Sequence, residues 1–272
     1  MNRMSQNTIL EIEKLEVVYH NVSTGIQGVS LAVKKDQIVA LLGNNGAGKT
    51  TTLRAVSGFL GMDNAKVSDG LIRFAGEDIQ NKPPHAVAQR GIAMVPEQDK
   101  IFESLTVEEN LMVSVMNKGA QGKTEKLYDL IFDYFPVLSK LKNRVGGYLS
   151  GGERQMLSLA TALLCSPRLL LVDELSLGLA PIIINELMGL IKIIRDELQI
   201  TVLLVEQNAQ AALEIADFCY VMENGRIVFS GDPAKLRGNK EIQEYYLGQG
   251  ERETTKSYRD VKQYRRTQRL YG

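Results

Sequence analysis

The chain has 272 residues, of which 44% are hydrophobic and 24% charged, the usage of an ordinary globular protein rather than of a disordered one. Lys plus Arg and Asp plus Glu both number 32, so the overall charge gives no indication of nucleic-acid binding. A chain of this length forms one large domain or two small ones, with a sizeable core.

Cysteine usage and hydropathy indicate the cellular compartment of the protein. Cys165 and Cys219 are the only cysteines and lie far apart in the sequence, which argues against a disulfide framework or a zinc site and favours a reducing compartment. No apolar run approaches the roughly 18–20 residues that cross a bilayer, and the first residues lack a signal-peptide core. We therefore expect a cytoplasmic protein that serves a membrane, if at all, from its surface.

The N-terminal part predicts strands. Residues 9–19 and 26–33 are expected to form two strands joined by a polar turn. Residues 38–42 are entirely apolar, as in a buried parallel strand. A glycine-rich turn follows, then a helix at about 50–59, and residues 70–79 predict a further strand pair at a sheet edge.

The second half changes period. Residues 101–165 have helical periodicity, whereas 169–172 and 201–205 are again short apolar strands, separated by a helix at 181–198. Strands and helices that alternate around an inserted helical block predict an α/β core with a mostly helical arm.

The glycine-rich turn predicts a phosphate-binding loop. Residues 43–50 read GNNGAGKT, which matches G-x-x-x-x-G-K-[ST] in full, directly after a buried strand and before a helix. Backbone N–H groups of such a loop surround the phosphates, and the helix N-terminus adds a positive partial charge. Lys49 is expected to reach the outer phosphates, and the Thr50 hydroxyl to ligate Mg²⁺. The predicted ATP-binding residues of this segment are Gly43, Asn44, Asn45, Gly46, Ala47, Gly48, Lys49, Thr50 and Thr51.

An apolar strand that ends in two carboxylates supports this interpretation. Residues 168–172 lead directly into Asp173 and Glu174. Asp173 is expected to hold Mg²⁺ through water, and Glu174 to accept a proton from the attacking water as general base. Two acids that merely cap the following turn would be the simpler interpretation, and the phosphate loop argues against it.

The segment 149–155 reads LSGGERQ and begins another helix. Ser150 and Glu153 form a capping box ahead of apolar residues. A plain helix start does not explain Gly151 and Gly152, each of which weakens a helix by roughly 1 kcal/mol relative to alanine. Glycines here are expected where bare backbone N–H groups must approach a phosphate closely.

With these three motifs the chain resembles the ATP-binding cassette (ABC) family, in which LSGG-type signatures precede the acid-tipped strand. The resemblance covers about residues 9–248. It implies an α/β, P-loop nucleotide-binding domain at 1–248 with an F1-like core, an antiparallel β subdomain and a helical subdomain at about 101–165 that carries the signature. Residues 249–272 are expected to form a separate tail with seven basic and three acidic residues. This tail is interpreted as a solvated helix or a docking strip, and contact with nucleic acid or anionic lipid is the alternative.

The same resemblance implies a shared site. Two chains sandwich two nucleotides, and Ser150 and Gly152 face the γ-phosphate of the other subunit's ATP. The signature residues assigned to the partner's ATP are Ser150, Gly151, Gly152 and Glu153. Residues 176–179 match the loop that crosses the dimer interface, although Leu175 stands where the family usually has proline.

Three further positions are assigned by this resemblance. Tyr19, which closes the first strand, matches the adenine-stacking aromatic. The loop after residues 95–96 usually carries a glutamine that ligates magnesium, and here Glu97 aligns with it while Gln98 follows; either could reach the metal. The family's switch histidine is replaced by Gln207, whose amide can donate a hydrogen bond to the γ-phosphate but cannot become cationic. The predicted catalytic residues are Glu174, Gln207 and Lys49.

Within the family, the chain most resembles the ATPase subunits of branched-chain amino acid importers. The strings that carry this likeness are VALLGNNGAGKTTT at 39–52, VPE at 95–97, LTVEENL at 105–111, LGLAP at 177–181, LVEQN at 204–208 and ENGR at 223–226. Residues 98–100 and the tail depart from it. The resemblance implies an identical or paralogous ATP-binding partner, two permease subunits, an extracytoplasmic solute-binding protein, and a place on the inner face of the cell membrane.

The expected function is therefore that of an importer ATPase for branched-chain or other hydrophobic amino acids, or related small solutes. One alternative is the ATPase of a lipopolysaccharide-type export system, where a histidine is expected at position 207. Another is a soluble ABC ATPase that acts on ribosomes or DNA; such proteins usually carry two cassettes or a long coiled-coil insertion, and this chain has neither. No specific nucleic-acid partner is expected.

Overall fold

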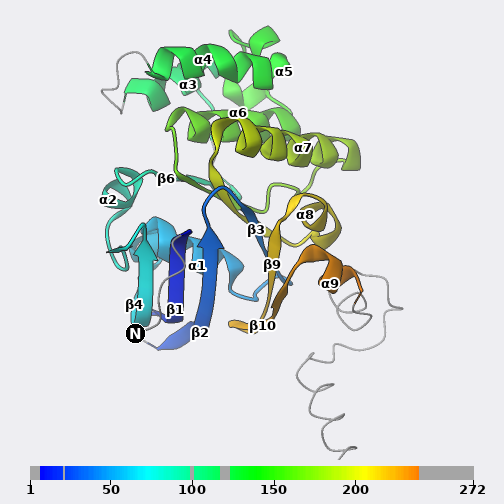
Figure 1. The fold of residues 1–272 in the computed structure, drawn as a ribbon. Helices are drawn as coiled ribbons and strands as arrows, with labels where there is room; N and C mark the ends of the chain where they lie inside the picture. The colour runs from blue at the N-terminus through cyan, green and yellow to red at the C-terminus, as the bar shows by residue number, and fades with distance from the viewer. Residues whose placement is uncertain (1–6, 21, 99–100, 117–122, 239–272) are drawn as a thin grey trace, which may run out of the picture.

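The computed structural model describes residues 7–20, 22–98, 101–116 and 123–238, so the predicted tail at 249–272 lies outside the described residues. The strands form two sheets (Figure 1). The antiparallel sheet has the order β2-β1-β4-β5 and contains β1 (Thr8–Tyr19), β2 (Ser23–Lys34), β4 (Ala65–Phe74) and β5 (Glu77–Asp78). The mainly parallel sheet has the order β10-β9-β3-β8-β7-β6 and contains β3 (Ile38–Leu42), β6 (Ile92–Val95), β7 (Leu169–Asp173), β8 (Thr201–Glu206), β9 (Phe218–Glu223) and β10 (Arg226–Gly231).

The helices fall into two groups. Those around the core are α1 (Lys49–Ser57), α2 (Pro84–Ala88), α7 (Pro181–Leu198), α8 (Ala209–Ile215) and α9 (Pro233–Arg237). Those of the arm are α3 (Val107–Met116), α4 (Lys123–Tyr134), α5 (Pro136–Lys140) and α6 (Gly151–Leu164). In the arm, at the top of Figure 1, α3, α4 and α5 all pack against α6.

The alternation of buried and exposed side chains along the strands determines how the layers pack. In β2, Val29, Leu31 and Val33 are buried and alternate with exposed residues, because successive side chains of a strand point to opposite faces. The short strands of the parallel sheet are instead buried on both faces. The antiparallel sheet therefore covers the core with one face only, as expected for the two kinds of sheet.

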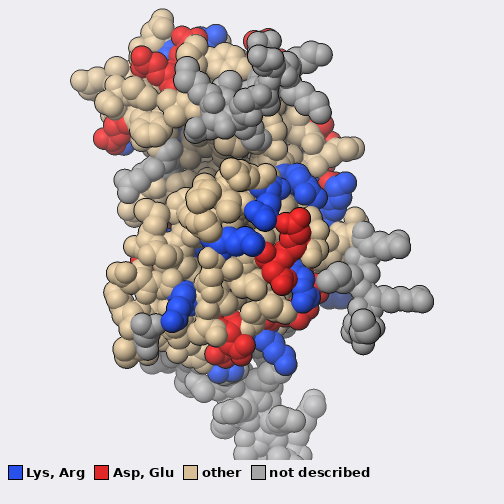
Figure 2. Space-filling model, turned by 90° about the vertical axis from the view of Figure 1, so that its left-hand side faces the viewer, with Lys and Arg blue, Asp and Glu red and all other residues tan. Residues whose placement is uncertain are grey.

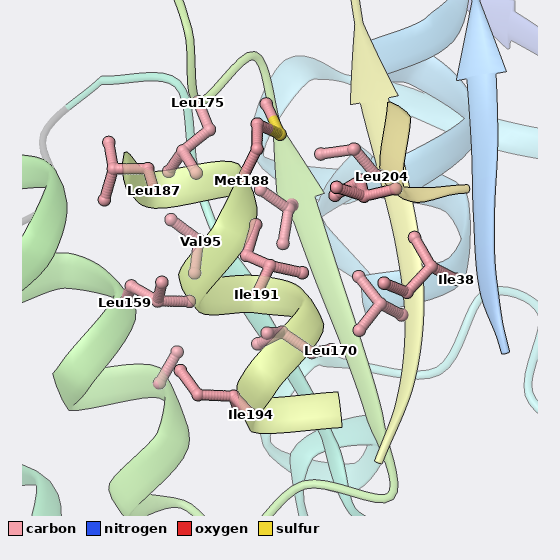
Figure 3. Close-up of a cluster of buried hydrophobic side chains, with 14 of the residues drawn as sticks. Ile38, Val95, Leu159, Leu170, Leu175, Leu187, Met188, Ile191, Ile194 and Leu204 are labelled. Atoms are coloured by element: carbon pink, nitrogen blue, oxygen red, sulfur yellow. The ribbon is translucent and has the colours of Figure 1, made fainter. Parts of the chain in front are cut away.

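The two faces of the parallel sheet belong to two different clusters. Leu41 of β3 packs in the cluster that contains α1 and the antiparallel sheet. Ile38 and Leu204 point to the opposite face, where they meet the cluster formed by α6, α7 and α8. Figure 3 shows this second cluster, in which Met188 and Ile191 of α7 lie against the sheet. Helix α7 is therefore held between the sheet and the arm.

The structure confirms most of the predicted elements. It also confirms the predicted α/β fold with a helical arm. Helix α7 has the predicted bounds, and the strand pair β4–β5 lies at a sheet edge as expected. Strand β4 begins at Ala65 rather than at residue 70, because Ala65–Asp69 pairs with the end of β1. Helix α1 ends at Ser57 rather than at 59, because Gly58 adopts the left-handed conformation that terminates helices.

The surface shows no extended field of one charge on the face drawn in Figure 2, where basic and acidic side chains are intermingled. Several of the chain's charged side chains form ion pairs, for example Arg90 with Glu77 at 3.0 Å and Arg73 with Asp78 at 3.1 Å. Among the described residues, no helix combines the length and apolar character needed to cross a membrane.

Candidate active site

The loop 43–48 connects β3 to α1, and its shape requires glycine. Gly48 has φ of 104°, which only glycine adopts without strain. A Cβ at this position would lie 2.6 Å from Cγ2 of Ile26 and 2.8 Å from Cε of Met222. The loop is therefore packed tightly between β2 and the end of β9, and α1 begins at Lys49 with its free N–H groups directed toward the loop.

A cavity of about 430 Å³ opens beside this loop, a volume suited to a small ligand. It is lined by Tyr19, Gly25, Asn45, Gly46, Gly48, Lys49, Thr50, Thr51, Glu97, Glu174 and Leu177. The structure thus brings residues of β1, the phosphate loop and the segment after β7 to one place. Of the predicted nucleotide residues, Gly43, Asn44 and Ala47 belong to the loop but do not line the cavity.

Lys49 is the central cation of the cavity. Its side chain is only 3% exposed, and Nζ lies 3.0 Å from Oε1 of Glu174. Nζ also donates hydrogen bonds to the carbonyl oxygens of Gly43 (2.8 Å) and Asn44 (3.2 Å). The ammonium is therefore satisfied by its own loop and by one carboxylate, and a phosphate group would compete with these partners.

Asp173 ends β7 behind the loop, where the Thr50 hydroxyl donates a hydrogen bond of 3.1 Å to its Oδ1. Burial raises the pKa of the Asp173 carboxyl from its ordinary 3.8 to about 6; the Thr50 hydrogen bond opposes this, and Glu174 reinforces it. A carboxylate and a hydroxyl are hard oxygen donors, so the pair fits Mg²⁺. The described residues contain no cluster of three or more His, Cys, Asp or Glu side chains placed to hold a metal.

Glu174 follows directly, in an unusual backbone conformation. Its φ of 46° lies in the left-handed region, which is unfavourable for a residue with a side chain. Its N–H donates a hydrogen bond of 2.9 Å to the carbonyl oxygen of Val205 in β8. The sheet therefore holds the backbone in the position that turns the carboxylate toward Lys49.

The two candidate magnesium ligands after β6, Glu97 and Gln98, differ in their position relative to the cavity. Glu97 lines the cavity, whereas Gln98 does not and is exposed. The Gln98 amide donates a hydrogen bond of 3.4 Å to Oε1 of Glu97. The geometry therefore places the carboxylate, rather than the amide, on the side of Asp173 and Thr50.

Tyr19 lies at the mouth of the cavity. Its hydroxyl is hydrogen-bonded to Oγ1 of Thr51 at 2.8 Å, and a Cβ at Gly25 would lie 2.6 Å from its ring. The ring is thus fixed between the start of β2 and the first turn of α1. Gly25 was not identified from the sequence, although its place just before the second predicted strand marked it as a turn glycine.

The signature residues lie apart from this cavity. Ser150 accepts a hydrogen bond from the Glu153 N–H, and the Glu153 side chain accepts one from the Ser150 N–H, so the predicted capping box is confirmed. A Cβ at Gly152 would lie 2.9 Å from Cγ2 of Ile183 in α7. Close packing against α7 is therefore a second reason for glycine here, and the chain does not bring its own signature to its own phosphate loop.

Gln207 immediately follows β8 and is exposed, and it does not line the cavity. Two residues of the site have places that the sequence interpretation did not assign. Leu177, expected only in the loop that crosses the dimer interface, forms part of the cavity wall. Glu206 is fully buried and binds Ser176; the only sequence signal for it was an acid at the end of an apolar strand.

A phosphate loop, a buried lysine and a strand that ends in paired carboxylates define a P-loop nucleotide-binding site. The ABC transporter family model matches residues 26–176, more than half of the chain. The chain belongs to the ATP-binding proteins of the ABC transporter family; it binds ATP and is an ATPase of that family.

The relatives include proteins of branched-chain amino acid transport and of lipopolysaccharide export. The high-affinity branched-chain amino acid transport ATP-binding protein BraG of Pseudomonas aeruginosa is 40% identical over 240 residues, 88% of this chain and 100% of BraG. A probable branched-chain amino acid transport ATP-binding protein, LivF, of Archaeoglobus fulgidus is 38% identical, over 81% of this chain and 91% of LivF. The lipopolysaccharide export system ATP-binding protein LptB of Haemophilus influenzae is 34% identical, over 89% of this chain and 98% of LptB.

Solved structures agree with the fold. The ADP conformation of MJ1267, an ATP-binding cassette of an ABC transporter, superimposes with a TM-score of 0.77 at 26% identity, covering 89% of this chain and 99% of MJ1267. The predicted family and the two-sheet architecture with its helical arm are therefore confirmed.

Proposed function

We propose that the chain is the ATP-hydrolysing subunit of an importer for branched-chain or other hydrophobic amino acids, or related small solutes. The observation that carries the catalytic part is the convergence of Lys49, Glu174 and the Thr50–Asp173 pair at one cavity. Lys49 binds the outer phosphates, and Glu174 accepts a proton from the attacking water.

The remaining residues bind and orient the nucleotide. Backbone N–H groups of the loop 43–48 and the N-terminus of α1 bind the phosphates, and Tyr19 stacks on the adenine. Thr50 and Asp173 hold Mg²⁺, which when bound neutralises charge on the phosphates. The place of Glu97 at the cavity wall favours it over Gln98 as the residue nearest the metal.

A complete site requires two chains in this proposal. The signature segment 150–153 serves the ATP of a partner subunit, and its distance from the chain's own phosphate loop supports that division. The capped N-terminus of α6 with Gly151 and Gly152 offers backbone N–H groups to an anion. The partner subunit is either a second copy of this chain or a paralogous ATPase.

Contact with permease subunits is assigned to the arm. Phe102 and Tyr148 are 57% and 74% exposed, although both are large and apolar. Their segments lie side by side, since Gly147 N–H donates to the carbonyl oxygen of Glu103 at 2.9 Å. Arg154 of α6 forms an ion pair with Glu103 at 3.2 Å. A permease seated on this surface would thus contact a segment bound to the signature helix at the inner face of the membrane.

Import of amino acids is favoured over export. The relatives BraG and LivF are both described as branched-chain amino acid transport proteins, and Gln207 departs from the histidine expected of a lipopolysaccharide-export ATPase. Lipopolysaccharide export stands as the second candidate because of the similarity to LptB.

Uptake in the native host tests the proposal. Deletion of the gene should abolish high-affinity uptake of radiolabelled leucine, isoleucine and valine. The wild-type chain should restore uptake, and Glu174→Gln, expressed at the same level, should not. Normal amino-acid uptake in the deletion strain, together with loss of lipopolysaccharide from the cell surface, would overturn the import assignment in favour of export.

A further inference from the structure

Glu206, at the end of β8, carries a carboxylate that is completely buried. Both of its oxygens accept hydrogen bonds from one residue, Ser176: Oε1 from the backbone N–H at 3.0 Å, and Oε2 from the hydroxyl at 2.6 Å. Both bonds use the carboxylate as an acceptor, and bonds of this kind are among the stronger hydrogen bonds in proteins. A strand end and a loop 30 positions earlier in the sequence are thereby fixed to each other.

Ser176 lies in two overlapping turns, 174–177 and 176–179, that contain two residues of the cavity wall. The N–H of Leu179 donates a hydrogen bond of 3.2 Å to the carbonyl oxygen of Ser176. The N–H of Leu177 donates one of 3.3 Å to the carbonyl oxygen of Glu174. Leu177 and Glu174 both line the cavity. A displacement of Ser176 would therefore disturb both turns, and with them the positions of Glu174 and Leu177 at the cavity.

Two further bonds hold the same segment. The Glu174 N–H donates a hydrogen bond to the carbonyl oxygen of Val205 in β8. The buried side-chain amide of Gln155 in α6 donates a hydrogen bond of 3.1 Å to the carbonyl oxygen of Leu175. Between these bonds Glu174 has its left-handed φ of 46°. Such a conformation persists only where its surroundings impose it, and Glu206 supplies two of the bonds that do so.

Burial of the Glu206 carboxyl disfavours its ionised form and so raises its pKa. The Ser176 hydrogen bonds lower that pKa, and the nearby Glu174 raises it further. An apolar side chain of similar volume would often serve packing alone as well or better. The acceptor geometry of Glu206 thus points to a role other than filling space.

We infer that Glu206 is a positioning residue for ATP hydrolysis: it holds Ser176 so that Glu174 keeps its place beside the phosphate loop. Glu206 does not line the cavity itself and acts through Ser176. The inference rests on the proposed role of Glu174 as the base, and it assigns to Glu206 the function of an acceptor rather than of a titrating acid.

Three substitutions test this in the full-length chain. Glu206→Met keeps the volume but accepts no hydrogen bond, and kcat should fall about 10- to 100-fold, as for small displacements of a reacting group. Glu206→Gln can accept from the Ser176 N–H and donate to its hydroxyl, so kcat should stay within about threefold of the wild type. Ser176→Ala loses one bond and should show an intermediate kcat.

The affinity for MgATP, measured with a fluorescent nucleotide, should change little in all three variants. Glu206→Met combined with Ser176→Ala should be no slower than Glu206→Met alone, because Glu206→Met already removes the hydroxyl bond that Ser176→Ala removes. Thr201→Val is the matched control: its hydroxyl, at the other end of β8, accepts a bond of 3.0 Å from the Asp36 N–H. This variant should lose thermal stability but not kcat.

The outcomes separate this inference from the proposed function. Wild-type kcat in Glu206→Met, with Glu174→Gln inactive, would overturn the role of Glu206 alone. Activity in Glu174→Gln would instead overturn the base. If Glu206→Gln were as slow as Glu206→Met, the acceptor role would be wrong. If Glu206→Met does not fold, Ser176→Ala decides: the inference requires kcat to fall at unchanged MgATP affinity.

Discussion

Nζ of Lys49 lies 3.0 Å from Oε1 of Glu174, and the two side chains are only 3% and 9% exposed. The proposed phosphate ligand and the proposed base are therefore bound to each other across the cavity. We expect an incoming γ-phosphate to take the place of the carboxylate on Lys49 and to leave Glu174 free to face a water molecule. Nucleotide binding would then release the proposed base.

The first prediction concerns this pair. Glu174→Gln should lower kcat at least about 100-fold, because general-base catalysis contributes about 10²–10⁴-fold. The variant should bind MgATP at least as tightly as the wild type, because Lys49 loses a competing anion, and it should accumulate ATP-dependent dimers. Phosphate release, nucleotide titration and gel filtration measure the three effects. Glu77→Gln, at an exposed position, is the matched control; near-normal turnover in Glu174→Gln would remove Glu174 as the base.

The second prediction concerns Asp173 and pH. Its pKa in the folded chain is about 6, above the ordinary 3.8, so the folded state binds this proton more tightly than the unfolded state. The stability contributed by that proton is present at low pH and is lost as the pH rises to about 6. Above that pH, the ionised carboxylate lowers the free energy of unfolding by on the order of 3 kcal/mol.

Asp173→Asn should therefore raise the melting temperature of the nucleotide-free protein at pH 7.5 by about 6–12 °C. Asn can still accept the Thr50 hydrogen bond. The gain should shrink as the pH is lowered from 7.5 to 4.5, and Mg²⁺-dependent hydrolysis should be lost. Calorimetry at several pH values measures this, with exposed Asp129→Asn as control. A gain of the same size at every pH would contradict the assigned cause.

The sequence predicted the parts of the site that are contiguous in the chain. The loop 43–50 and the pair Asp173–Glu174 are short motifs whose spacing follows from the chemistry. In the structure most of the loop and Glu174 line one cavity, and Asp173 is hydrogen-bonded to Thr50 beside it. The sequence could not predict the bond between Glu206 and Ser176, which depends on how β8 and the loop after β7 pack together. An acid at a strand end has many possible partners, and only the fold selects one.

The same reasoning explains the misplaced start of β4. The segment AKVSDG alternates weakly and contains residues that are uncommon in strands. It is extended because Val67 pairs with Val17 of β1, and no local pattern reveals that partner. Helix α7, in contrast, has a long apolar period and a proline in its first turn, signals that lie within the helix itself.

The third prediction tests the shared site. Ser150→Arg should leave ATP binding to the isolated chain nearly intact, because Ser150 does not line the chain's own cavity. Hydrolysis and ATP-dependent dimerisation should be suppressed, since a bulky cation would stand where the partner's phosphate must approach. Ser139→Arg places the same side chain at an exposed position of α5 and should change neither. Loss of ATP binding by monomeric Ser150→Arg would show that the two-chain arrangement is wrong.

The last prediction concerns Gln207, which is exposed immediately after β8 and does not line the cavity. We predict that its amide donates one neutral hydrogen bond to the γ-phosphate in the assembled, nucleotide-bound dimer. A charged imidazolium in its place would donate a bond roughly twice as strong. Gln207→Ala should therefore slow hydrolysis about tenfold, equivalent to about 1.4 kcal/mol of barrier, with little change in ATP affinity.

Gln207→His should keep the activity and add a pH dependence near the ordinary histidine pKa of about 6.5, because only the protonated ring makes the stronger bond. Gln210→Ala, an exposed glutamine of α8 three positions further along the chain, is the matched control and should hydrolyse ATP at the wild-type rate. The pH profiles of kcat for the four proteins measure the effect. Parent rates in both Gln207 variants at every pH would mean that Gln207 is only a polar residue at a strand end and does not contact the phosphate.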